Sequence, residues 1–160
     1  MENPFPIKWQ EVIHRDKDEE KHTADVKTDE GWTIEFQHSP FKPEERRNRN
    51  NFYKKIVWVA DGLRREKDKP KLDKVLGEGG VISTDNFRFS YAYLPEDSRI
   101  LREWMNSKVP VFFNLNESFL WFLLPIVLND TVYLRQAEND FFIEAQTSNG
   151  FEDFLKFVYT

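Results

Sequence analysis

The sequence predicts a single α/β domain with a mixed central sheet flanked by helices, and three observations support this prediction. The chain has 160 residues, of which 39% are hydrophobic and 16% aromatic, enough to bury a core. Residues 32–37 and 131–136 alternate apolar and polar side chains, as half-buried strands do. Residues 56–61 and 109–115 are almost continuously apolar, which is typical of strands covered on both faces.

An antiparallel meander is predicted near the start of the chain. Its three strands are 9–16, 22–26 and 32–37, and polar turns separate them. Gly31 ends the second turn, where positive φ carries no steric cost. In the third strand the alternation separates two faces, Trp32, Ile34 and Phe36 on one and Thr33, Glu35 and Gln37 on the other.

A helix and a buried strand are predicted to follow the meander. Residues 38–55 form the helix, since Glu44 and Glu45 suit its positive end and lysines its other end. With strand 56–61 it completes a βαβ crossover. Residues 62–80 are strongly polar, and we expect them to be a flexible connection.

The remainder of the chain, 81–160, is predicted to add further strands and helices to the same domain. The core motif spans 9–62, and nothing in the sequence indicates a second domain or an internal repeat. The expected elements are one or two strands in 81–94, a short helix in 96–108, strands at 109–115, 118–128, 131–136 and 140–146, and an amphipathic helix in 149–160. Phe112, Phe113, Trp121 and Phe122 are expected in the core.

Composition excludes several classes of protein. The chain has no cysteine, so disulfides and thiolate metal sites are impossible. The longest apolar run, 118–128, is too short to span a membrane and contains Pro125. The first residues lack the charged start and apolar middle of a signal peptide. We therefore expect a cytoplasmic protein without membrane segments.

Charge is distributed unevenly along the chain. The net charge is −5, but residues 41–75 contain 12 Lys and Arg against 6 Asp and Glu. A basic segment in an acidic protein can face a polyanion, and Arg46, Arg47 and Arg49 lie within it. The alternative is a solvated helix face followed by a charged loop.

Two carboxylates are predicted to face each other in the meander. If strands 22–26 and 32–37 pair with residue numbers that sum to 60, Asp25 lies opposite Glu35. Opposed like charges destabilise a sheet, whereas Mg²⁺ or Mn²⁺ between them would stabilise it. Gln37 projects from the same face and could orient a water or a phosphate oxygen. The alternative is an ordinary solvent-facing strand edge.

Four motifs in this part of the chain resemble one known family. HTADV, IEFQHS, RNNFY and IVWVADG together are similar to the nuclease domain of the CoiA-like competence proteins, within the PD-(D/E)XK or restriction-endonuclease-like superfamily. The resemblance is dense from about residue 9 to 62 and looser afterwards. The matching positions are Asp25, Glu35, Gln37, Ser39, Arg49, Tyr53 and Trp58.

The resemblance implies a divalent-metal-dependent nuclease with a restriction-endonuclease-like fold. Asp25, Glu35 and the backbone carbonyl of Phe36 would bind Mg²⁺ or Mn²⁺, and Glu11 on the first strand is a further candidate ligand. Gln37 would take the place that lysine holds in most of the superfamily. Candidate substrate-binding residues are Ser39, Arg46, Arg49, Tyr53 and His38, although Arg49 and Tyr53 could instead lock the helix onto the sheet.

One departure from the family leaves the activity open. Members of the superfamily usually begin with a helix before the first strand, but only about eight residues precede the first strand here. That helix is expected to be absent or short, or to be supplied by a partner chain or a second copy. The expected function is cleavage of nucleic acid, DNA before RNA. The alternative is a non-catalytic module that binds DNA or a protein and retains the nuclease fold.

Overall fold

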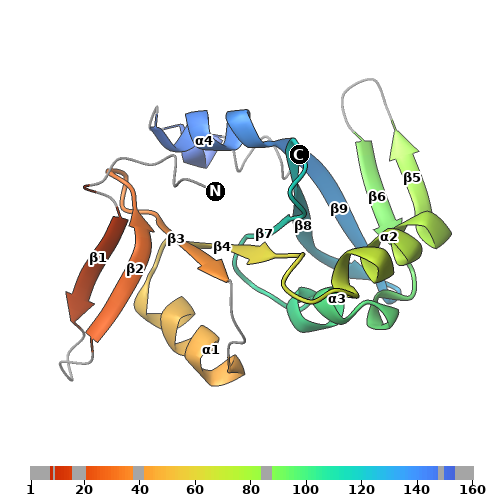
Figure 1. Ribbon diagram of the computed structural model, residues 1–160, viewed down its shortest axis with the longest axis horizontal. Helices are drawn as coiled ribbons and strands as arrows, with labels where there is room; N and C mark the ends of the chain where they lie inside the picture. Colours follow the sequence, from red (N-terminus) through yellow and green to blue (C-terminus); the bar gives the residue numbers. More distant parts are fainter. Residues whose placement is uncertain are drawn as a thin grey trace.

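A computed structural model describes most of the chain, and the structural statements below concern those residues. They are 8, 10–15, 21–37, 42–83, 88–147 and 150–153. Within them the chain forms an α/β fold with one mixed sheet, as predicted. The sheet lies between α4 on one side and α1 and α3 on the other (Figure 1). None of the helices described is both long and apolar enough to cross a membrane.

The sheet has the strand order β1-β2-β3-β4-β7-β8-β9-β6-β5. Among the described strands, only the β3–β4 and β4–β7 neighbours are parallel. The strands are β1 Gln10–Arg15, β2 Lys21–Lys27, β3 Thr33–Gln37, β4 Ile56–Asp61, β5 Gly80–Ser83, β6 Arg88–Ala92, β7 Val111–Asn114, β8 Phe119–Leu128 and β9 Thr131–Glu138.

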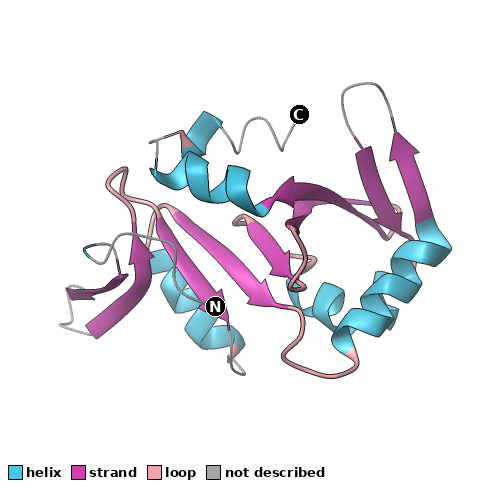
Figure 2. Cartoon of the chain, turned by 45° about the horizontal axis from the view of Figure 1, so that its top comes forward, coloured by secondary structure: helices cyan, strands magenta, loops and turns pink. Residues whose placement is uncertain are grey.

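Helices cover both faces of this sheet, as Figure 2 shows with helices in cyan and strands in magenta. They are α1 Pro43–Phe52, α2 Asp68–Gly79, the 3₁₀ helix η2 Pro95–Asp97, α3 Arg99–Trp104 and α4 Asn139–Thr147. The region 81–94, in which one or two strands were expected, holds two, β5 and β6.

The predicted meander and crossover are confirmed. β1, β2 and β3 are antiparallel neighbours, and α1 connects β3 to the parallel strand β4. Gly31 has φ of 86° in the turn before β3, in the left-handed region that favours glycine. The helix begins later than expected, at Pro43, whose missing N–H costs nothing at a first helical position.

Two apolar clusters lie on opposite faces of the sheet. One contains Ile34 with Val57, Val59 and Phe112, and Trp32 and Phe36 pack against it. The other includes side chains from β4, β7, α2 and α3. Since neighbouring residues of a strand point to opposite faces, Thr33, Glu35 and Gln37 lie on the face of the second cluster. The predicted alternation of β3 is therefore confirmed, and Phe112, Phe113 and Phe122 are buried as expected.

The prediction of a polar connection over 62–80 is wrong for residues 68–80, whereas 62–67 contain neither helix nor strand. Residues Asp68–Gly79 form α2, because Leu72 and Val75 are three positions apart and both are buried against the second apolar cluster. Most charges of this helix face solvent, but Asp68 is buried and accepts a hydrogen bond from Arg65. Because charged residues surround the few buried apolar positions, Leu72 and Val75, the apolar face of the helix was not recognised from the sequence.

Shortening Leu72 tests whether α2 is an integral part of the core. Leu72 is fully buried, so Leu72→Ala should lower the free energy of unfolding by about 2–5 kcal/mol. Lys71→Ala, an exposed neighbour on the same helix, should change it by less than about 0.5 kcal/mol. Urea unfolding of the parent and both variants measures this. Equal stability of Leu72→Ala and the parent would contradict the packing of α2.

The prediction of a strand over 140–146 is also wrong. These residues belong to α4, in which Phe142 and Ala145, three positions apart, are buried on the first apolar cluster. Short apolar runs fit a strand and a buried helix turn equally well, and tertiary packing decides between them. Of the helix expected over 149–160, residues 151–153 are helical. Residues 149 and 154–160 lie outside the described part of the chain.

Candidate functional site

The carboxylates of Asp25 and Glu35 belong to neighbouring positions of β2 and β3. The pairs Val26–Ile34 and Lys27–Thr33 have numbers that sum to 60, the register expected from the sequence. Extending it by one residue places Asp25 opposite Glu35. There the Asp25 Oδ2 accepts a hydrogen bond of 2.8 Å from the backbone N–H of Phe36. A side chain thus satisfies a backbone donor of β3 at this point.

Glu35 is buried and ion-paired with the helix that follows its strand. Only 4% of the Glu35 side chain is exposed, and its Oε1 lies 2.8 Å from the Nη1 of Arg49 on α1. Tyr53, directly after α1, is also buried, with 3% exposed. Of the two roles considered for Arg49 and Tyr53, the structure supports the locking of α1 onto the sheet. Binding of a phosphate by either residue stays a prediction.

Burial and crowding change the acidity of Glu35. Burial raises its pKa to about 8, and the negative charge of Asp25 and a hydrogen bond with it act in the same direction. Arg49 opposes these effects through its charge and its hydrogen bond but does not cancel them. The charged form of Glu35 is therefore disfavoured at this site, and a bound cation would favour it.

Gln37 lies on the same face of β3 as Glu35, two residues further along. It is 6% exposed and lies across from Ala60 of the parallel strand β4. β3 is an interior strand with β2 and β4 on either side. The alternative that Glu35 and Gln37 are polar residues of a solvent-facing strand edge is therefore wrong, because both side chains are buried inside a paired strand.

Sequence reasoning overlooked Lys27. It follows Asp25 by two positions on β2, which places both residues on the same face, and its partner in the sheet is Thr33. The Lys27 Nζ lies 3.3 Å from Thr33 Oγ1 and 5.4 Å from the centre of the Tyr53 ring. Burial lowers its pKa. The spacing of two residues between Asp25 and Lys27 could have predicted this, because residues two apart in a strand share a face. Lys27 is therefore a cation next to the carboxylate pair.

Tyr53 is a poor candidate for a general base. Burial raises its pKa to about 12, and the negative charges of Glu35 and Asp25 add to this effect while Arg49 opposes it. The phenol therefore stays protonated near neutral pH. As a neutral group it can donate a hydrogen bond but cannot remove a proton from water.

Arg46, a predicted substrate-binding residue, packs against α3. Its guanidinium lies 4.1 Å from the centre of the Trp104 ring, and its Nη2 donates a hydrogen bond of 2.9 Å to the carbonyl oxygen of Glu103. Burial lowers its pKa, and the charge of Glu103 opposes this. These interactions connect α1 to α3.

The remaining predicted site residues are only partly covered by the structure. Gln10 pairs with Val26 and Val12 with Ala24, so the backbone register places Glu11 opposite Asp25. The candidate ligand Glu11 therefore belongs to the same row of the sheet as the carboxylate pair. His38 and Ser39 lie outside the described residues, and their roles stay predictions.

The described donor set suits a cation that keeps part of its hydration shell. Within the described part of the chain no three His, Cys, Asp or Glu side chains form a group that could hold a metal. One oxygen of Asp25 accepts the Phe36 N–H, one of Glu35 accepts from Arg49, and the two carboxyls share a hydrogen bond that a bound cation would replace. Mg²⁺ binds through one or two carboxylates and retains waters, so these two residues fit it.

Comparisons with known proteins identify no relative of this chain. No protein-family model, curated protein or solved structure matches it. Evidence for function therefore comes from the sequence pattern and the geometry of the site.

Proposed function

We propose that this protein is a divalent-metal-dependent nuclease that hydrolyses phosphodiester bonds of nucleic acid, DNA before RNA. One observation supports this above the others. The β2–β3 register, extended by one pair, places Asp25 opposite Glu35, and Glu35 is buried with its pKa raised to about 8. Burial and the charge of Asp25 disfavour ionisation of Glu35, Arg49 offsets only part of this, and perturbed carboxyls of this kind are found at enzyme sites.

Each residue of the site has a role in this proposal. Asp25 and Glu35 would hold Mg²⁺ or Mn²⁺, with the Phe36 carbonyl and Glu11 as further candidate ligands. The cation would polarise a phosphate and make a bound water more acidic. Arg49 positions the Glu35 carboxylate, as their separation of 2.8 Å indicates. The buried amide of Gln37 would orient water or a phosphate oxygen.

A second candidate is a non-catalytic module that binds nucleic acid or a protein. It is favoured by the interactions that each carboxylate already has, Glu35 with Arg49 and Asp25 with the Phe36 N–H. A site that has lost its cation could persist in this form, since Arg49 partly compensates Glu35. The two candidates differ in metal binding and in cleavage.

Metal binding can be measured through thermal stability. A ligand that binds only the folded state stabilises it by RT ln(1 + [L]/Kd), about 2.7 kcal/mol at a hundredfold excess over Kd. The melting temperature should therefore rise with Mn²⁺ in the parent and not in Asp25→Asn. Asp130→Asn is the matched control, because it removes one charge at an exposed turn between β8 and β9. A rise of the same size in Asp25→Asn would exclude Asp25 as a ligand.

Activity itself is tested by incubating the protein with plasmid and with labelled single-stranded oligonucleotide. Mg²⁺, Mn²⁺ and a chelator are compared. The proposal expects nicking or degradation that the chelator stops. No cleavage of either substrate with either metal would favour the second candidate.

A further inference from the structure

We propose that the hollow between α1 and the segment after α3 binds a phosphate group of a nucleic-acid backbone, next to the carboxylate pair. This inference rests on the proposed function for its choice of ligand. The hollow, named here the α1–α3 hollow, has a volume of about 470 Å³. Its hydrogen-bonding and charged lining includes Arg46, Arg47, Asn50, Glu103 and Lys108.

Positive charge dominates this hollow. Arg46, Arg47 and Lys108 line it, and Glu103 is the only acidic residue of its lining within the described part of the chain. Arg47 and Lys108 are exposed to solvent. Arg46 is held against Trp104 and uses Nη2 for the Glu103 carbonyl, so its guanidinium is already positioned.

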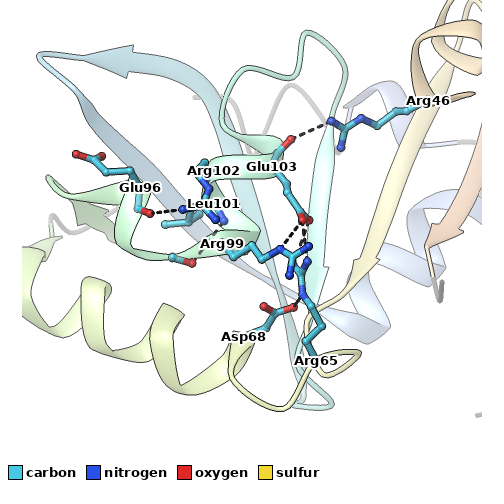
Figure 3. Close-up of polar contacts among 9 residues, drawn as sticks. Arg46, Arg65, Asp68, Glu96, Arg99, Leu101, Arg102 and Glu103 are labelled. Atoms are coloured by element: carbon cyan, nitrogen blue, oxygen red, sulfur yellow. Dashed lines mark hydrogen bonds and ion pairs between the residues drawn. The ribbon is translucent and has the colours of Figure 1, made fainter. Parts of the chain in front are cut away.

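The Glu103 carboxylate is occupied elsewhere. Arg65 donates to both of its oxygens, at 2.7 and 3.1 Å, and Arg99 donates to Oε1 at 3.1 Å. Figure 3 shows these two arginines converging on the carboxylate, whereas Arg46 approaches the backbone of the same residue. These charge-assisted hydrogen bonds hold the pKa of Glu103 low although burial alone would raise it. The acid therefore pairs directly with Arg65 and Arg99, and it acts on Arg46 only through its charge.

Asn50 adds a neutral donor of known orientation. Its Oδ1 accepts a hydrogen bond of 2.7 Å from the Trp58 indole nitrogen. An indole N–H can only donate, so the amide oxygen must face Trp58. The Nδ2 group of Asn50 is consequently the part of the amide that remains to donate to a ligand in the hollow.

The position of the hollow relates it to the candidate site. Asn50 follows Arg49, which binds Glu35, and its partner Trp58 lies across from Glu35 in the β3–β4 pair. A backbone whose scissile phosphate lay at Asp25 and Glu35 would therefore have neighbouring phosphates within reach of α1. The Glu103 carboxylate is paired with Arg65 and Arg99, so the donors of the hollow can bind an anion from solution. A guanidinium matches the geometry of a phosphate well.

Asn50→Asp tests this site with a minimal change of shape. The carboxylate can still accept from Trp58, but it replaces the Nδ2 donor with an acceptor and a negative charge. Binding of labelled single-stranded and duplex oligonucleotides is measured by fluorescence anisotropy in chelator, so that neither metal nor cleavage contributes. We expect affinity to fall on the order of tenfold or more, as for loss of a hydrogen bond to a charged group. Asn48→Asp, on the same helix outside the hollow, should have a much smaller effect.

A second variant removes charge without altering buried groups. Arg47→Gln with Lys108→Gln should reduce the slope of log K against log salt by about one for each phosphate that the variant no longer binds. Lys54→Gln, an exposed lysine outside the hollow, should leave the slope unchanged. Circular dichroism confirms folding of each variant. Unchanged binding by both hollow variants, equal losses in the controls, or no binding by the parent at low salt would each overturn the proposal.

Two further comparisons separate the possible ligands and the two proposals. Inorganic phosphate is added at constant ionic strength. Inorganic phosphate that binds the parent and not Asn50→Asp, together with oligonucleotide binding that neither phosphate nor the hollow variants alter, would assign the hollow to a small free phosphate, against the proposal. Cleavage absent in the parent, with oligonucleotide binding weakened by Asn50→Asp, would reject the nuclease and retain the phosphate site.

Discussion

Glu35→Gln should abolish metal-dependent cleavage while the fold persists. The change removes the charge that would bind the cation but keeps an oxygen that can accept from Arg49 Nη1. It also removes the repulsion from Asp25, so the folded state should not be weakened. Loss of a single donor to developing charge costs on the order of 10²–10³ in rate, and loss of a metal ligand should cost at least about 10³. Plasmid nicking and degradation of a labelled single strand measure the rate.

A matched variant and a chelator show whether the measured cleavage comes from this site or from a contaminating nuclease. Glu138→Gln makes the same substitution at the exposed end of β9 and should cleave as the parent does. Activity that persists undiminished in Glu35→Gln, or that ignores the chelator, would show that cleavage comes from another site or another protein. Circular dichroism of Glu35→Gln shows whether a loss of activity reflects chemistry or unfolding.

Metal affinity should depend steeply on pH, through the same residue. Because the pKa of Glu35 is raised to about 8, the cation must displace a proton from it below that pH. The affinity for Mn²⁺ should therefore rise roughly tenfold per pH unit, or about a hundredfold from pH 6 to pH 8, and level off above. Isothermal titration calorimetry in buffers of different ionisation enthalpy measures both affinity and proton release. Affinity independent of pH over this range would contradict a proton on Glu35.

Stability without metal should show the opposite dependence on pH. The folded-state pKa of Glu35 is raised from 4.5 to about 8, so the folded state binds more protons than the unfolded state between those values. The contribution of Glu35 protonation to the free energy of unfolding is therefore complete below about pH 4.5, and it is lost as pH rises through about 8. Urea unfolding should show a larger decline for the parent than for Glu35→Gln. Parallel declines would mean that other groups determine the pH dependence.

Much of the fold could be predicted from local patterns. Strand β3 alternates apolar and polar residues, and β4 is apolar up to its last residue, Asp61, so both were recognisable as strands. The turn at Gly31 and the short spacing of the first strands indicated antiparallel pairing. The register in which paired residue numbers sum to 60 was an assumption that the structure confirms. These features depend on residues near one another in the chain, and local patterns are sufficient there.

Segments whose pattern fits two structures could not be assigned in this way. Residues 62–80 have enough charge for a loop, and only the packing of Leu72 and Val75 on the sheet makes α2 stable. Residues 140–146 suit a strand by composition, but Phe142 and Ala145 pack on the sheet as one face of α4. In both cases the free energy comes from burial against distant strands, which a local window does not contain.

The sequence by itself determined which chemistry is possible, because it provides Asp25, Glu35 and Gln37 at strand spacing, no thiol ligand and a basic stretch in an acidic chain. Only the tertiary structure decided how those groups are used. It buries Glu35 beside Arg49, places Lys27 near Tyr53, and pairs the Glu103 carboxylate with Arg65 and Arg99. Burial and partnership decide which charges are neutralised and which face a ligand, and both depend on interactions between residues far apart in the chain.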